Sequence, residues 1–114
     1  MTWNRGDVVM VDFPFVDQTG SKYRPALVLS STAFHKERTQ DVIVCVISTK
    51  IEKYKGKTDF PLKDWQKAGL TQASVVRCTL LTILAARINR KVGTLSRQDL
   101  QGASKCLKLS LELN

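Results

Sequence analysis

The sequence predicts a mainly β domain, in which a small antiparallel, barrel-like sheet is followed by one C-terminal helix. Short runs of β-branched and aromatic residues recur along residues 7–95, and polar or turn-forming residues separate them. Little chain remains between these runs for helices, so neighbouring strands are expected to pair antiparallel. After residue 95 the apolar spacing becomes that of a helix.

Six segments carry the strand pattern, and they are residues 7–15, 25–30, 41–49, 58–62, 74–84 and 90–95. Pro14 is expected to end the first of them. The third is β-branched along most of its length, which favours a strand buried on both faces. The polar stretch 32–41 and the charged stretch 50–57 are expected to be loops. Residues 63–70 resemble a helical turn that ends at Gly69.

The C-terminal helix begins with a recognisable capping pattern. Ser96 followed by Asp99 resembles a capping box, although Asp is shorter than the usual Glu. Leu95 and Leu100 have the spacing of a hydrophobic staple. Apolar residues then recur at helical spacing, at Leu100, Ala103, Leu107 and Leu111. These features predict one helix that closes the fold.

Length and composition indicate one globular domain over residues 1–114 with one modest core. Hydrophobic residues make up 43% of the chain and charged residues 25%, which is ordinary for such a domain. No run approaches the roughly 18 apolar residues of a membrane span, and the N-terminus does not resemble a signal peptide. A cytoplasmic protein that does not enter a membrane is therefore expected.

The charge balance is unusual. Eighteen Lys and Arg residues against ten Asp and Glu residues give a net charge of +8 and a pI near 9.7. A small basic domain suggests a polyanionic partner, of which nucleic acid is the commonest. A cation-rich surface that serves only solubility is the alternative.

Metal and cofactor chemistry has little support in the sequence. The three cysteines lie inside apolar runs, at Cys45, Cys78 and Cys106. They lack metal-ligand spacing, so they are interpreted as buried thiols of a cytosolic protein. His35, the single histidine, is expected on a surface loop. Asp59 and Asp64 are too isolated to suggest a metal pair, and no cofactor is predicted.

Five stretches in order resemble the PemK/MazF-type toxins of bacterial toxin–antitoxin pairs. They are RGDVVMVDF at 5–13, YRPALVLSS at 23–31, VISTK at 46–50, SVVRC at 74–78 and RKVGTLSRQDL at 90–100. Each stretch is weak by itself, but together they cover nearly the whole chain. The resemblance implies an SH3-like barrel with a C-terminal helix, a homodimer, and metal-independent, sequence-specific cleavage of single-stranded RNA. It also implies an acidic cognate antitoxin, with operator DNA bound only in complex with that antitoxin.

The resemblance assigns the chemistry to Arg24, Ser48 and Arg77. Cleavage without a metal requires removal of the 2′ proton, stabilisation of charge on the phosphoryl oxygens, and a proton for the leaving 5′ oxygen. A guanidinium suits the second task because it is planar, always charged and bidentate toward phosphate. Pro25 also restricts Arg24 to an extended backbone. The alternative for Arg24 is an exposed arginine in a surface ion pair.

The other two residues have defined roles in the same scheme. Ser48 falls where the family carries a threonine or serine, and its hydroxyl could hydrogen-bond a non-bridging phosphate oxygen. Arg77 is interpreted as a second charge clamp, because arginine is a poor acid. The alternatives are a polar strand end for Ser48 and a solvent-side strand arginine for Arg77.

Further residues are expected to bind the substrate. Four lysines surround Tyr54 in the stretch 50–57, at Lys50, Lys53, Lys55 and Lys57. Lysines supply affinity for the RNA backbone, and a tyrosine can stack on an unpaired base. The expected substrate surface also includes Asp17, Gln18, Tyr23 and Thr49. A solvated loop is the alternative for 50–57, and Trp65 is expected to plug the core.

Two departures from the family pattern concern the general base. Relatives commonly carry an acidic residue two positions after the place of Arg77, where this chain has Thr79 and then Leu80. They also commonly carry a Glu in the loop after the first strand, where Asp17 is the only carboxylate. Asp17 could substitute, catalysis could depend on geometry and charge, or activity could be weak or lost. The alternative functions are thus an inactive module that binds RNA or antitoxin, and a purely structural scaffold.

Overall fold

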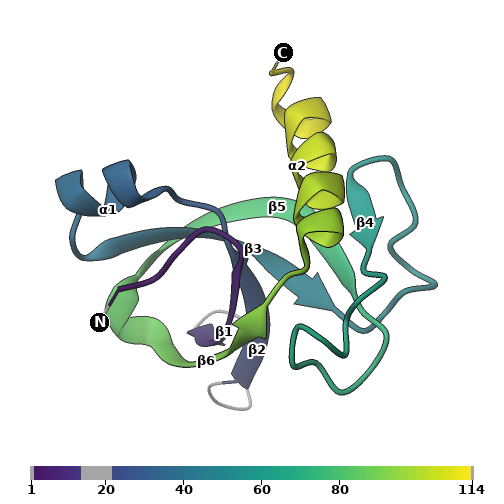
Figure 1. Ribbon diagram of the computed structural model, residues 1–114, viewed down its shortest axis with the longest axis horizontal. Coiled ribbons are helices and arrows are strands. Elements are labelled where there is room, and N and C mark those ends of the chain that lie inside the picture. The colour runs from purple at the N-terminus through teal and green to yellow at the C-terminus, as the bar shows by residue number, and fades with distance from the viewer. Residues whose placement is uncertain (1, 14–21, 114) are drawn as a thin grey trace.

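The computed structural model describes residues 2–13 and 22–113, which fold into a six-stranded sheet and a C-terminal helix (Figure 1). The strands are β1 (Asp7–Phe13), β2 (Lys22–Val28), β3 (Asp41–Ser48), β4 (Asp59–Pro61), β5 (Val75–Leu84) and β6 (Ile88–Thr94). The helices are α1 (Thr32–Glu37), the 3-10 turn η1 (Ala85–Arg87) and α2 (Arg97–Leu111).

The strands lie in the order β4-β5-β3-β2-β1-β6, and every pair is antiparallel. Figure 1 shows the sheet curving round a common centre, with α2 standing at one side of it. Within the described residues the outer strands β4 and β6 do not pair, so the barrel stays open. The prediction of a mainly β antiparallel sheet with a C-terminal helix is confirmed.

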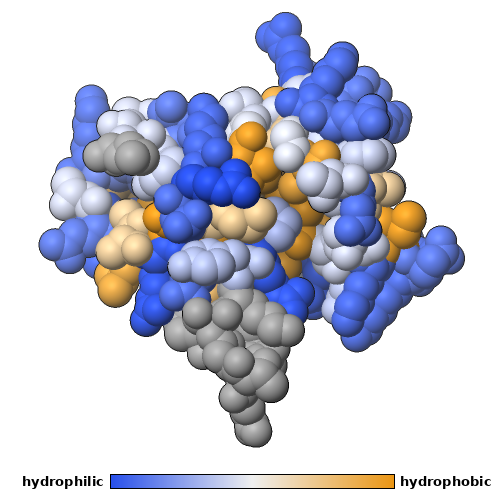
Figure 2. Space-filling model, turned by 90° about the horizontal axis from the view of Figure 1, so that it is seen from below, coloured by the Kyte–Doolittle hydropathy of each residue, from blue (hydrophilic) through white to orange (hydrophobic). Residues whose placement is uncertain are grey.

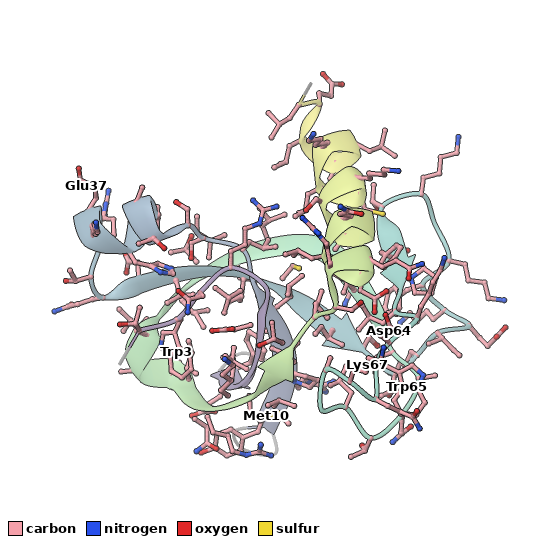
Figure 3. The ribbon with its side chains drawn as sticks, viewed as in Figure 1. Trp3, Met10, Glu37, Asp64, Trp65 and Lys67 are labelled. Carbon is pink, nitrogen blue, oxygen red and sulfur yellow. The ribbon has the colours of Figure 1, made fainter. Side chains whose placement is uncertain are left out.

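Both faces of the central strands are buried, because the side chains alternate between two apolar clusters. In β1, Val8 belongs to the cluster beneath α2, whereas Val9 belongs to the cluster that also holds Trp3. Trp3 lies within the curve of the sheet (Figure 3). In β3, Val44 and Cys45 divide between the two clusters in the same way. The predicted burial of the third strand on both faces is therefore confirmed.

Helix α2 docks through its first turn and a glycine. The Ser96 hydroxyl accepts a hydrogen bond from the Asp99 backbone N–H at 3.2 Å, so half of the capping box forms. The Asp99 carboxylate turns away from the cap and accepts from the backbone N–H groups of Lys63 and Asp64, at 3.0 and 2.8 Å. Gly102 lies so close to Phe60 of β4 that a Cβ there would be 2.2 Å from the ring. The helix is thus fixed to β4 and to the turn after it.

Helix α1 was not expected, because residues 32–41 show no apolar periodicity. Its six residues include no buried side chain, so burial leaves no pattern in the sequence. Ser31 caps the helix by accepting from the Phe34 N–H at 3.1 Å. His35 therefore lies on a helix and not on a loop, with its Nε2 atom 2.5 Å from the Ser30 hydroxyl.

The start of the second strand was predicted imprecisely. Strand β2 runs from Lys22 to Val28, so it begins three residues before Pro25, where the predicted strand 25–30 started. Proline is tolerated there because β2 pairs with β3 only from Ala26 onward, so Pro25 faces the free edge.

The segment after β4 turns at Gly69, whose φ is +85°, and Trp65 packs against the apolar cluster beneath α2 as predicted (Figure 3).

The three cysteines are free thiols. Cys45 is buried, whereas Cys78 and Cys106 are half-buried, so the predicted burial is complete only for Cys45. Burial raises the pKa of Cys45, and burial and the neighbouring Cys106 raise the pKa of Cys78 to about 12. These thiols therefore stay protonated at neutral pH and are poor nucleophiles.

Candidate active site

The β2–β3 register places Arg24 and Ser48 on the same face of the sheet. Ala26 of β2 lies opposite Val46 of β3. Arg24 precedes Ala26 by two positions and Ser48 follows Val46 by two, so side-chain alternation directs both to the face of that pair. The two strands stop pairing at this point, which leaves Arg24 and Ser48 at the level where the sheet opens.

The β3–β5 register adds Arg77 to the same face. Ser48 lies opposite Val75, and Arg77 is two positions further along β5. Strand β4 pairs with this part of β5, and there Asp59 lies opposite Arg77. The three residues assigned from the family resemblance thus come from β2, β3 and β5 and share one face at one end of the sheet.

Arg77 is held by an aromatic ring. Its guanidinium carbon lies 4.0 Å from the centroid of the Tyr54 ring, and the Lys53 ammonium lies 5.4 Å from the same centroid. Both are cation–π distances. Tyr54 therefore positions Arg77, in addition to the base stacking that the sequence predicts for it.

Arg24 is exposed and has no carboxylate partner within the described residues. Two other arginines do have such a partner: Arg38 pairs with Asp41 at 3.7 Å and Arg87 with Asp12 at 3.5 Å. An exposed guanidinium without a partner keeps all its donors available to an anion.

The Ser48 hydroxyl can still donate a hydrogen bond. Its oxygen accepts a hydrogen bond from the Lys50 backbone N–H at 3.0 Å. Because that bond uses a lone pair, the hydroxyl proton remains available to donate to a phosphate oxygen. The neighbouring Thr49 is exposed.

The four lysines of residues 50–57 differ in whether an ion pair offsets their charge. Lys55 is paired with Glu52 at 2.5 Å, which offsets its charge. The other three have no carboxylate partner in the described part of the chain, and they are Lys50, Lys53 and Lys57. In Figure 2, hydrophilic side chains dominate the right-hand edge of the molecule, on the side where the segment between β3 and β5 runs in Figure 1.

A hollow of about 390 Å³ lies beside Arg77, and its lining includes Tyr54, Lys55, Asp59 and Val75. Asp59 was missed by sequence reasoning, which considered it only as a metal ligand. A larger hollow of about 490 Å³ lies beside α1, where its lining includes Trp3, His35 and Asp41 and none of the residues around Arg77.

The remaining candidates divide into two groups. Tyr23 is 55% exposed, but it lies opposite Asp12 and so faces away from Arg24. Asp17 and Gln18 lie outside the described residues. In the ranges 2–13 and 22–113, no three His, Cys, Asp or Glu side chains gather as metal ligands. In the same ranges no helix has the length and apolar character that crossing a membrane requires.

Solved structures of known proteins share the fold of this chain. The toxin MazF-mt6 of Mycobacterium tuberculosis is 22% identical, with a TM-score of 0.76 over 95% of this chain and 98% of that one. A MazE–MazF structure from Deinococcus radiodurans is 20% identical, with a TM-score of 0.77 over 100% of both chains. An endoribonuclease in complex with its cognate antitoxin, from a mycobacterial species, is 17% identical, with a TM-score of 0.77 over 99% of this chain and 98% of that one.

At these identities the solved structures show a shared fold. The comparison with curated protein sequences found no match. A family model described as "PemK-like, MazF-like toxin of type II toxin-antitoxin system" matches residues 4–111. That match spans nearly the whole chain, and the chain therefore belongs to the PemK-like, MazF-like family of type II toxins.

Proposed function

We propose that this toxin is a metal-independent endoribonuclease that cleaves single-stranded RNA in the cytoplasm. The observation that carries the proposal is the convergence of Arg24, Ser48 and Arg77 on one face of the sheet, where Arg24 has no carboxylate partner among the described residues. Two guanidinium groups and a hydroxyl donor form an arrangement suited to a phosphate whose negative charge increases in the transition state.

The reaction needs no group other than RNA and side chains. The 2′ oxygen attacks the adjacent phosphorus, the P–O2′ bond forms, and the P–O5′ bond breaks. The proton lost from the 2′ hydroxyl ends on the 5′ oxygen. Arg24 and Arg77 bind the non-bridging oxygens, and Ser48 donates a hydrogen bond to one of them. The products carry a cyclic phosphate and a 5′ hydroxyl.

Incubation of the pure protein with single-stranded RNA in excess chelator tests the proposal. We expect discrete fragments with 5′-hydroxyl and cyclic-phosphate ends. RNA binding without cleavage would support the second candidate, a catalytically weak or inactive module that binds RNA or antitoxin. The observation that favours this second candidate is Thr79, which occupies the position where relatives commonly carry a carboxylate.

The lysines of residues 50–57 are expected to differ in their contribution to RNA binding. Replacing Lys53 and Lys57 by glutamine should reduce the slope of log affinity against log salt by about 1.4, since each lost phosphate contact removes about 0.7 for a single strand. Lys55→Gln should change the slope less, because Lys55 is already paired with Glu52. Fluorescence anisotropy with labelled RNA between 50 and about 200 mM salt measures both. Equal slopes in the double variant and the wild type would place this loop away from RNA.

The proposed partners are an acidic cognate antitoxin and a second copy of the chain. One of the similar structures is an endoribonuclease in complex with its cognate antitoxin, and another is a MazE–MazF structure, which supports the first partner. With a charge of +8, the toxin attracts an acidic flexible segment that can fold as it binds. Operator DNA would be contacted only through that complex.

We expect the antitoxin to compete with RNA for the face that holds Arg24. Titrating the purified antitoxin into a complex with labelled RNA should release the RNA, and the release should weaken as salt rises. A ternary complex, in which RNA remains bound while the antitoxin also binds, would show that inhibition acts from another surface.

A further inference from the structure

RNA cleavage by this route needs a base, and the usual position for one is occupied by groups that cannot accept a proton at neutral pH. Thr79 is an exposed hydroxyl, and Leu80 packs against the α2 cluster. A carboxylate that acts on the 2′ hydroxyl has to lie on the face of Arg24, Ser48 and Arg77, close to an open space that admits RNA.

Asp59 meets this requirement through the β4–β5 register. It lies directly opposite Arg77, and directly opposite residues in an antiparallel pair point to the same face. Its neighbour Phe60 points the other way, toward Gly102 of α2. Asp59 also lines the 390 Å³ hollow together with Tyr54, the residue whose ring holds Arg77.

The Asp59 carboxylate is fixed by one oxygen. Its Oδ2 atom accepts a hydrogen bond from the Gly56 backbone N–H at 2.9 Å, and the side chain is half-buried. Within the described residues, Oδ1 has no hydrogen-bond donor, and Asp59 forms no ion pair, even with Arg77 opposite. One oxygen is thus oriented by the backbone while the other is available to take a proton.

Most other described carboxylates are already engaged. Ion pairs involve Asp7 with Lys91, Asp12 with Arg87, Asp41 with Arg38 and Glu52 with Lys55. Asp99 is fully buried, and its carboxylate accepts hydrogen bonds from two backbone N–H groups. Asp59 differs from these carboxylates, because only one of its oxygens accepts a hydrogen bond and it lies opposite Arg77, a proposed catalytic arginine.

We propose that Asp59 is the general base of this toxin, a role that rests on the proposed ribonuclease function. Oδ1 of Asp59 takes the proton of the 2′ hydroxyl as that oxygen attacks phosphorus. The P–O2′ bond forms and the P–O5′ bond breaks, and the leaving 5′ oxygen takes a proton from solvent water. Asp59 then returns its proton to solvent, so that no water is consumed overall.

The test compares Asp59→Asn with Asp64→Asn in the intact protein. The asparagine oxygen can still accept from Gly56, but its amide cannot take a proton. We expect Asp59→Asn to slow single-turnover cleavage by about 100-fold, the lower end for a lost general base, with RNA affinity unchanged. Asp64 lies half-buried in the turn after β4 (Figure 3), and its side chain makes no hydrogen bond or ion pair with the described residues. Asp64→Asn should therefore stay within about 2-fold of the wild type.

A pH profile separates catalysis from positioning. Wild-type cleavage should fall as acid protonates the base, and the Asp59→Asn variant should lose this acid limb. Other titratable or charged groups around Asp59 are Glu52, Tyr54, Lys55, Arg77, Cys78 and Cys106. Only Glu52 among them could produce a similar limb, so Glu52→Gln should retain it.

Chemical rescue gives an independent readout. Asp59→Ala leaves room for a small carboxylate in the hollow, so added formate should restore part of its cleavage, and more at higher pH within the acid limb. Wild-type rates in Asp59→Asn, an unchanged acid limb, or reduced RNA affinity with no formate rescue would each overturn the role of Asp59 while leaving the ribonuclease function intact. Absence of cleavage by the wild type on every single-stranded RNA would overturn both.

Discussion

Replacing Arg24 by alanine is expected to slow RNA cleavage by about 100- to 1,000-fold, the effect of removing one preorganised donor to a developing oxyanion. The fold should be unaffected, because Arg24 is exposed and no described side chain depends on it for an ion pair. Arg24→Lys should recover little of the rate, because lysine lacks the planar fork that binds two phosphate oxygens at once.

Arg38→Ala is the matched control, since Arg38 is an exposed arginine just after α1 whose one ion pair among the described residues is with Asp41. It removes the same charge from a different surface and should cleave at the wild-type rate. Single-turnover rates at saturating protein measure the chemical step, and thermal melting confirms that each variant is folded. If Arg24→Ala cleaves as fast as Arg38→Ala, Arg24 does not contact the scissile phosphate.

The strands could be predicted from the sequence because they bury alternating or continuous apolar side chains. Strand β3 is an example, since Val44 and Cys45 are both buried and the run has no polar interruption. Helix α2 was predictable because Ala103 and Leu107 repeat at helical spacing on its buried side. Helix α1 buries nothing, so only its Ser31 cap distinguished it from a loop.

The site was predictable only in part. The family resemblance, and not local physics, singled out Arg24, Ser48 and Arg77. Asp59 could not be found in this way, because its position opposite Arg77 depends on the β4–β5 register. Register is set by how whole strands and their turns pack, and a short strand such as β4 has too few residues to specify it by pattern.

The largest effect on stability is expected from Asp99→Ala. Asp99 is fully buried, and its two carboxylate oxygens accept from the backbone N–H groups of Lys63 and Asp64. Hydrogen bonds to a charged group contribute about 1.5–3 kcal/mol each, and the alanine would leave both N–H groups without an acceptor. We expect the free energy of unfolding to fall by about 3 kcal/mol or more, which corresponds to a Tm lower by roughly 10 °C.

Two further variants show whether the carboxylate itself causes this loss. Asp99→Asn keeps one acceptor oxygen and should lose about half as much stability. Asp64→Ala removes a nearby carboxylate that makes no side-chain hydrogen bond or ion pair with the described residues, and it should change stability by less than about 0.5 kcal/mol. Urea unfolding followed by tryptophan fluorescence measures all three, and Trp65 reports directly on the turn that Asp99 holds. Because that turn follows β4, loosening it should also disturb Asp59, and cleavage by the folded fraction of Asp99→Ala should decline. An Asp99→Ala protein as stable as Asp64→Ala would mean that water replaces the carboxylate at no cost, and that α2 is held by its apolar contacts.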